Sequence, residues 1–224
     1  MNKATISADI VSSTSLNTKQ RLKLEKDLNK LLNLLRENFE TSFYGRLLKG
    51  DYIECVLEEP QLALRTALLI KAFVKSLTIQ SDKKNGQKLT EFKEQGIRIA
   101  VGVGELSIWN RKKGIIDGPA IYLSGRAVNE MSASDKKIKR TLSFNSANND
   151  WNTIFEPVFN LLDVLLLKYK RAQSEIIFYK LLNKSEKEIT QILKKSQSTI
   201  NQHSTATGWY AVENAVECFE KTIK

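Results

Sequence analysis

The order of apolar patterns between residues 4 and 103 restricts the possible folds of this chain more than any other feature. Buried strands show short apolar runs or strict alternation, whereas helices place apolar residues at intervals of three and four. In chain order these patterns predict a strand over 4–11, a helix over 19–39, strands over 43–48 and 52–57, a helix over 61–77 and a strand over 97–103. Lys49-Gly50-Asp51 separates the two middle strands, which is typical of a hairpin. We therefore expect an α+β domain with the βαββαβ order of a ferredoxin-like sheet.

The rest of the chain divides into a mixed segment and a helical one. Its patterns predict a polar loop over 81–95, a strand ending at Ile108, a basic loop over 109–114, a helix over 119–131 and a strand over 141–144. The small, polar, Asn-rich stretch 146–152 is typical of a boundary, and every pattern after it is helical. We expect two domains, 1–148 and 149–224, of which the second is all-α.

Composition narrows the class of protein. The 224 residues are 42% hydrophobic and 27% charged, which is typical of an ordered globular protein, and the formal net charge of +10 favours anionic partners. Cys55 and Cys218 stand far apart without other metal-ligating residues, so we expect buried free thiols and no disulfide. The longest apolar stretch, 158–167, is too short to cross a bilayer, and the first residues lack the pattern of a secretion signal. We expect a cytoplasmic protein without a membrane partner.

Two aspartates follow apolar runs at points where predicted strands end. Asp9 precedes the polar stretch Ser12-Ser13-Thr14, and Asp51 lies in the predicted hairpin turn. Carboxylates at neighbouring strand ends are the ligands that a hard divalent cation and a triphosphate require. The pattern predicts Asp9 and Asp51 as ligands of Mg²⁺ or Mn²⁺. In the alternative interpretation each aspartate only caps a helix or closes a turn.

The order of these motifs resembles the catalytic domain of class III nucleotide cyclases. The matching stretches are Asp9-Ile10-Val11-Ser12-Ser13-Thr14, Lys49-Gly50-Asp51 and the segment from Gly118 to Arg126. The resemblance implies cations on Asp9 and Asp51 and a catalytic role for Arg126. It also implies that nucleotide phosphates lie at Ser12, Ser13 and Thr14.

Three positions depart from the cyclase pattern. Ser12 stands where the family has the glycine of the phosphate turn, whose backbone amides must approach the phosphate closely. Tyr122 stands where the family has an asparagine that orients the ribose, and Leu47 where it has a lysine that reads the base. These departures argue against cyclisation, while binding of a metal or a nucleotide stays open.

A helix-turn-helix pattern lies near the C-terminus. Ser185 and Glu188 have the spacing of a capping box, 194–196 is a predicted turn, and a further helix begins at Gln197. The residues spaced to pack these helices together are Ile189, Ile192, Leu193 and Ile200. Short hydrogen-bonding side chains and flanking cations suit base edges and phosphates, so the predicted DNA-contacting residues are Lys194, Lys195, Gln197, Ser198, Thr199, Asn201, Gln202 and His203. An ordinary helical hairpin is the alternative.

The stretch from Glu188 to Ile200 resembles the helix-turn-helix of bacterial regulators, although Lys194 replaces the usual glycine of the turn. A cyclase-like segment followed by such a motif resembles the SatD family of bacterial proteins, and this resemblance covers nearly the whole chain. It implies a DNA-binding transcriptional regulator, a homodimer whose first domain senses a ligand or dimerises. A metal-dependent nucleotide enzyme is the alternative, and a protein–protein adaptor is a third hypothesis.

Overall fold

The computed structural model describes residues 1–78, 86–133 and 140–224, and of residues 86–89 the backbone alone. The strands of the described residues are β1 Lys3–Ile10, β2 Phe43–Leu48, β3 Tyr52–Leu57, β4 Ile97–Gly104, β5 Ile108–Asn110, β6 Ile115–Asp117 and β7 Leu142–Ser146. The α-helices are α1 Thr18–Phe39, α2 Ala63–Ser76, α3 Gly86–Gln95, α4 Pro119–Ala133, α5 Asn149–Leu167, α6 Arg171–Leu181, α7 Glu186–Leu193, α8 Gln197–Ala206 and α9 Trp209–Thr222. Short 3₁₀ turns lie at η1 Ser13–Ser15, η2 Glu40–Ser42 and η3 Pro60–Leu62.

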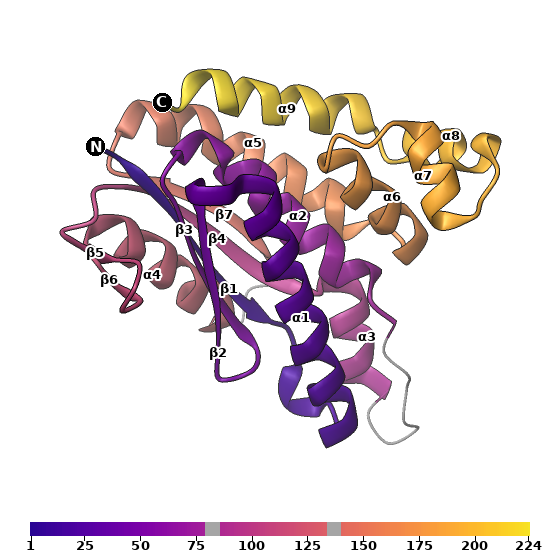
Figure 1. The fold of residues 1–224 in the computed structure, drawn as a ribbon, viewed down its shortest axis with the longest axis horizontal. Coiled ribbons are helices and arrows are strands. Elements are labelled where there is room, and N and C mark those ends of the chain that lie inside the picture. The colour runs from indigo at the N-terminus through magenta and orange to yellow at the C-terminus, as the bar shows by residue number, and fades with distance from the viewer. Residues whose placement is uncertain (79–85, 134–139) are drawn as a thin grey trace.

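Five strands form one sheet in the order β2-β3-β1-β4-β7 (Figure 1). The central strand β1 is antiparallel to both β3 and β4, which places Asp9 between Tyr52 and Arg98. β2 is antiparallel to β3, and β7 joins the edge of β4 in parallel. The predictions of a mixed α+β structure and of the hairpin formed by β2 and β3 are confirmed.

Helices cover both faces of the sheet. The side chains from Ala4 to Ile10 at even positions of β1 join the main hydrophobic core, together with leucines of α1 and α2 and phenylalanines of α5. The odd positions of β1, which include Thr5, Ser7 and Asp9, face the opposite side. That second face is covered in part by α4, which contacts β1 and β4.

Polar contacts hold α4 against β1. Thr5 Oγ1 donates to Ala120 O at 2.9 Å, and the Ser124 hydroxyl oxygen lies 2.9 Å from the hydroxyl oxygens of both Thr5 and Ser7. Gly102 permits this close approach, because a Cβ at that position would lie 2.2 Å from Ala120 O. These contacts fix the position of α4 beside the strand that carries Asp9.

The C-terminal helices share the core of the sheet. Phe155 and Phe159 of α5 and Phe219 of α9 surround Phe144 of β7, with ring centroids 5.2 to 5.7 Å from that of Phe144. One hydrophobic cluster therefore contains residues from both sides of residue 148. Every regular element of the described chain after residue 148 is a helix. A separate all-α domain and the division into domains 1–148 and 149–224 stay predictions.

Three local predictions are wrong. Residues 86–95 of the predicted loop form α3. Good helix formers and the burial of Phe92 stabilise this helix although its sequence shows no helical period of apolar residues. Residues 79–85 lie outside the described part of the chain. The strand ending at Ile108 does not continue the main sheet, because β5 pairs with β6 in a separate hairpin that includes part of the predicted basic loop. Cys55 is buried as expected, but Cys218 is exposed on α9.

Two lysines of α2 are buried and connect the sheet with α5. Lys71 Nζ donates to Thr141 Oγ1 at 2.5 Å and lies 3.6 Å from Asp163 Oδ1. Asp163 also accepts from Thr141 N at 2.6 Å. One turn later, Lys75 Nζ donates to the carbonyl oxygens of Glu94, Leu166 and Leu167 at 2.7 to 3.0 Å, near the C-terminal ends of α3 and α5. A cation is favourable at such ends, where carbonyl groups lack partners within the helix.

The buried lysines predict that stability rises with pH. Burial lowers the pKa of Lys75 to about 7, with a smaller contribution from the Lys71 charge, and burial lowers the pKa of Lys71 to about 8. Since an unfolded lysine has a pKa of about 10.4, the unfolded chain binds more protons between pH 7 and 10. The free energy of unfolding should therefore increase from pH 7 to pH 9 in urea titrations. Lys75→Met removes one of these groups and should show a smaller increase; an equal increase in both proteins would contradict this account.

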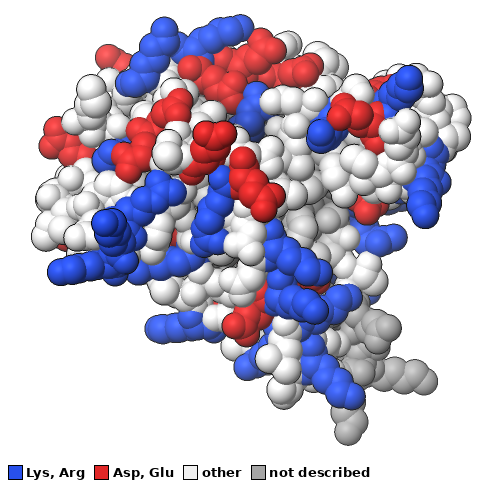
Figure 2. Space-filling view, viewed as in Figure 1, with Lys and Arg blue, Asp and Glu red and all other residues white. Residues whose placement is uncertain are grey.

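Charge is unevenly distributed over the surface. Figure 2 shows Lys and Arg side chains gathered over α1 and acidic side chains along α9 at the top of the same face. The basic residues of α1 are Lys19, Arg21, Lys23, Lys26, Lys30 and Arg36. Within the described residues, no helix is both long enough and apolar enough to span a membrane.

Candidate functional site

The hairpin turn between β2 and β3 brings Asp51 to the end of β1. Lys49 and Gly50 both have positive φ angles, 51° and 81°, and Asp51 N donates to Leu48 O at 3.3 Å, as in a tight hairpin turn. Ile10 N donates to Asp51 O at 3.2 Å, so the turn is bonded to the strand that carries Asp9. The hairpin turn and this hydrogen bond therefore place the two predicted aspartates at the same end of neighbouring strands.

Asp9 is half-buried, and Arg98 is its cationic neighbour among the described residues. Arg98 Nη1 lies 3.3 Å from Asp9 Oδ2, and Ser132 Oγ of α4 lies 3.5 Å from the same oxygen. Burial raises the pKa of the Asp9 carboxyl above its ordinary value; the Arg98 guanidinium acts against this rise, and the Asp51 carboxylate adds to it. The two aspartates are thus close enough to repel each other, and a bound cation would relieve that repulsion.

The donor atoms fit a hard divalent cation. Asp51 Oδ2 accepts from Ser13 Oγ at 2.6 Å, and the contacts of Asp9 are made through Oδ2. In the part of the chain that the structure describes, no residue donates to Oδ1 of either aspartate, which leaves one carboxylate oxygen on each. No group of three or more His, Cys, Asp or Glu side chains arranged for a metal occurs among these residues. A cation here would therefore complete its shell with water or phosphate oxygens, as Mg²⁺ commonly does.

In the turn after Asp9, Ser12 has a backbone conformation that glycine adopts more easily than other residues. Ser12 has φ 56° and ψ 27°, the left-handed region that favours glycine, and its Oγ donates to Glu91 of α3 at 2.9 Å. Ser15 and Leu16 donate the hydrogen bonds that close the turn. Of the three residues predicted to contact phosphate, Ser12 directs its hydroxyl at Glu91. Ser13 is half-buried and Thr14 is exposed.

A recess of about 170 Å³ lies beside Asp51. Its lining includes Ser13, Thr14, Asp51 and two cations, Lys49 of the hairpin turn and Arg21 of α1. Arg21 Nε donates to Leu16 O at 3.0 Å and Nη2 donates to Thr14 O at 2.9 Å, which fixes the turn against α1. The recess thus combines hydroxyl groups, two cations and two carboxylates, those of Asp51 and Glu25. These groups suit phosphate oxygens together with a metal cation.

The other residues of the cyclase-like pattern lie apart from the carboxylates. The Arg126 guanidinium lies 6.0 Å from the ring centroid of Tyr122, on the exposed surface of α4. Tyr122 donates its hydroxyl to Asp117, and Leu47 packs against the hydrophobic core. Among the described residues, neither Arg126 nor Tyr122 contacts Asp9 or Asp51.

Sequence reasoning missed Arg98, Ser132, Arg21 and Lys49 as parts of this site. Arg98 had a usable signal, because it alternates with the buried Ile97 and Ile99 and must face the side of the sheet that carries Asp9. Ser132 and Arg21 had none, since their positions depend on how α4 and α1 pack.

The predicted helix-turn-helix segment folds as α7, the turn 194–196 and α8. Ser185 and Glu188 form the predicted capping box, and Ser196 caps α8 by accepting from Thr199 N. Lys194 has φ 51° and ψ 44°, so it adopts the left-handed conformation that glycine usually supplies. Ile189 and Ile200 are buried with Ile176 of α6, whereas Ile192, which was expected to pack inside, is 45% exposed.

The predicted DNA-contacting residues form a polar surface around the start of α8. Lys194, Gln197, Ser198, Asn201 and Gln202 are exposed, and Lys195, Thr199 and His203 are half-buried. Lys195 Nζ lies 3.6 Å from Glu175 Oε2, so its charge is partly balanced.

No protein-family model and no curated protein matches this chain. The similar solved structures include two of a bacterial light-regulated adenylyl cyclase, both with a TM-score of 0.44, at 14% and 15% identity over 64% of this chain. The matches span 43% and 74% of those chains, so the first covers less than half of its counterpart. The guanylyl cyclase Cya2 matches at 16% identity and a TM-score of 0.37, over 58% of this chain and 70% of its own. At these scores the three matches assign neither an activity nor a ligand to this chain.

Proposed function

We propose that this protein binds a nucleoside triphosphate together with Mg²⁺ or Mn²⁺ at Asp9 and Asp51. The observation that carries the proposal is the backbone hydrogen bond from Ile10 N to Asp51 O, which brings the hairpin turn that carries Asp51 to the end of the strand that carries Asp9. Each aspartate also has one carboxylate oxygen without a donor among the described residues. A divalent cation supplies charge neutralisation and orientation of phosphate oxygens.

The surrounding residues have defined parts in this proposal. Asp9 and Asp51 hold the cation, and Ser13 orients Asp51 through its hydrogen bond. Lys49 and Arg21 line the adjoining recess and balance the charge of the phosphates. Arg98 favours the ionised form of the half-buried Asp9, because its charge opposes the effect of burial on the Asp9 pKa.

The proposed function is binding without cyclisation. Cyclisation requires groups that orient the ribose and stabilise charge at the reacting phosphorus, and Tyr122, Leu47 and Arg126 make their contacts away from the two carboxylates. Calorimetric titration with ATP and with GTP, each with and without Mn²⁺, tests the proposal. Binding should require Mn²⁺, and chromatography should recover the nucleotide unchanged. Binding that is equally tight in EDTA would contradict the metal-dependent part.

DNA binding by α7 and α8 is a second candidate function. It is favoured by the buried contact of Ile189 with Ile200, which fixes the two helices, and by the exposed hydrogen-bonding residues Gln197, Ser198, Asn201 and Gln202 on α8. Such side chains can read base edges, and the basic charge of the chain would supply phosphate contacts.

Replacing both Gln197 and Asn201 by alanine should weaken binding to a selected DNA duplex at least about tenfold, because each lost base contact costs about 1–3 kcal/mol. Binding to unrelated duplex should change little. Fluorescence anisotropy with a duplex selected from a random pool measures both. Gln191→Ala on the exposed surface of α7 is the matched control. Absence of any DNA binding at 50 mM salt would rule out this function.

The finer parts of the sequence interpretation remain proposals. The sheet order β2-β3-β1-β4 supports a ferredoxin-like classification, and the order of motifs supports membership of the SatD family. A transcriptional regulator that forms a homodimer in the cytoplasm would combine both candidate functions, with nucleotide binding as its sensing step.

A further inference from the structure

A hollow of about 520 Å³ lies where four helices meet, apart from the aspartates. Its walls are the C-terminal ends of α2, α3 and α5 together with the start of α6. This volume falls within the range of about 300–1,000 Å³ that small-molecule sites occupy. No residue of the hollow belongs to the recess beside Asp51.

The lining has an excess of positive charge. Lys93, Lys168, Lys170 and Arg171 are exposed, and among the described residues of the lining Glu94 is the one that is acidic. Within the described chain, Lys93, Lys168 and Lys170 make no ion pair, while Arg171 Nη1 donates to Thr78 Oγ1 at 2.9 Å. Unpaired cations around a concave surface raise the local concentration of anions.

The same hollow offers an apolar surface. Val74, Phe92 and Tyr169 are buried residues of its lining, and Leu77 and Leu167 are half-buried. Lys75 also contributes, but its Nζ is already bonded to three carbonyl oxygens. Small-molecule sites commonly combine apolar walls with a few polar groups that fix orientation.

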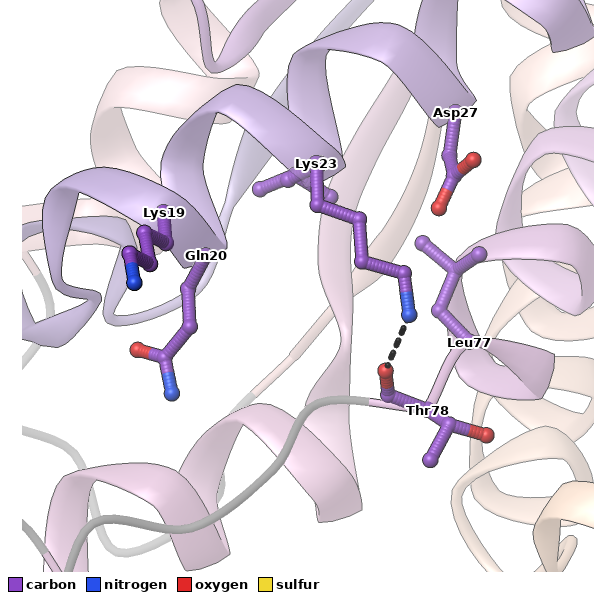
Figure 3. Close-up of a pocket in the computed structure, with 7 residues that line it drawn as sticks. Lys19, Gln20, Lys23, Asp27, Leu77 and Thr78 are labelled. Carbon is purple, nitrogen blue, oxygen red and sulfur yellow. Dashed lines mark hydrogen bonds between the residues drawn. The ribbon is translucent and has the colours of Figure 1, made fainter.

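A neighbouring hollow is smaller than this one, and its charges are partly balanced. It measures about 200 Å³ and shares Leu77 and Thr78 with the larger one. Figure 3 shows Lys23 directed at Thr78, to whose carbonyl oxygen it donates at 3.3 Å, with Asp27 on the same helix. Its charges are therefore partly balanced, and it is smaller.

We propose that the larger hollow binds a small phosphorylated molecule with an aromatic or aliphatic body. Lys168, Lys170 and Arg171 would contact the phosphate, because these three cations lie together in the lining around the start of α6. Phe92 and Tyr169 would contact the body of the ligand.

The probe is 1-naphthyl phosphate, titrated into the full chain by calorimetry in EDTA, which removes the divalent cations needed at Asp9 and Asp51. Saturable binding is expected, and inorganic phosphate and 1-naphthol should each bind at least tenfold more weakly. Lys168→Gln with Lys170→Gln should weaken binding about tenfold. The matched control removes two exposed lysines of α1, Lys26→Gln with Lys30→Gln, and should change affinity less than twofold.

Several outcomes would overturn the proposal. They are no binding at millimolar probe, equal weakening in the two double variants, or tight binding of inorganic phosphate alone. Loss of binding in Lys49→Gln would place the probe in the recess beside Asp51 instead. Because the titration contains no divalent cation, its result is independent of the proposed metal-dependent function.

Discussion

Replacing Lys71 by methionine is expected to lower the free energy of unfolding by about 3–5 kcal/mol at pH 7. The substitution leaves Asp163 buried without its cation, and removes the donor to the carbonyl oxygens of Ile97 and Thr141. Lys71 and Asp163 connect α2, the start of β7 and α5, so loss of the Lys71 ammonium should weaken the packing of all three elements. Urea denaturation followed by circular dichroism measures it.

A double variant separates the charge effect from the loss of packing. Lys71→Met with Asp163→Asn removes both charges and keeps an acceptor for Thr141, so it should be more stable than Lys71→Met alone. Lys26→Met, on the exposed surface of α1, should change stability by less than about 0.5 kcal/mol. If the double variant were less stable than Lys71→Met alone, the assignment of a buried ion pair would be wrong.

Asp51→Asn is expected to weaken Mn²⁺-dependent nucleotide binding by about a hundredfold or more, since it removes an anionic ligand of the cation. The asparagine can still accept the hydrogen bond from Ser13, so the fold of the turn is kept. Asp9→Asn should have a similar effect on binding. Calorimetry with Mn²⁺ and GTP measures the change, and thermal unfolding confirms that each variant is folded.

Glu25→Gln provides the control within the same recess. Glu25 is exposed and lines the recess beside Asp51, so its substitution removes the same charge at nearly the same place. If Asp51 acts by coordination, Glu25→Gln should bind nucleotide at least as tightly as the natural chain. Equal weakening in Glu25→Gln and Asp51→Asn would show that only the general negative charge of the recess matters.

Local patterns predicted the framework of the fold well. The apolar and aromatic runs 43–48 and 52–57 predicted the bounds of β2 and β3, and the leucine spacing over 19–39 predicted α1 to within a residue. These elements are long or bounded by clear turn residues, so their patterns are unambiguous. Strand order also accounts for the pairing of Asp9 with Tyr52, the residue after Asp51. The role of the two aspartates as metal ligands stays a prediction.

Tertiary contacts decided what the sequence could not show. α3 lacks a visible period in the sequence, and the burial of Phe92 against the rest of the protein helps to stabilise it. The site cations Arg21 and Arg98 come from elements distant in sequence, and only packing brings them to Asp51 and Asp9. The unexpected burial of Lys71 and Lys75 likewise depends on partners in α3 and α5 and on Thr141, which precedes β7.

The most direct measurement is anomalous diffraction from crystals grown with Mn²⁺ and a non-hydrolysable nucleoside triphosphate. The account predicts an anomalous peak about 2.0–2.3 Å from a carboxylate oxygen of Asp51 and of Asp9, with phosphate density beside Lys49. Nucleotide density accompanied by no peak at these carboxylates, or by a peak elsewhere on the chain, would contradict it.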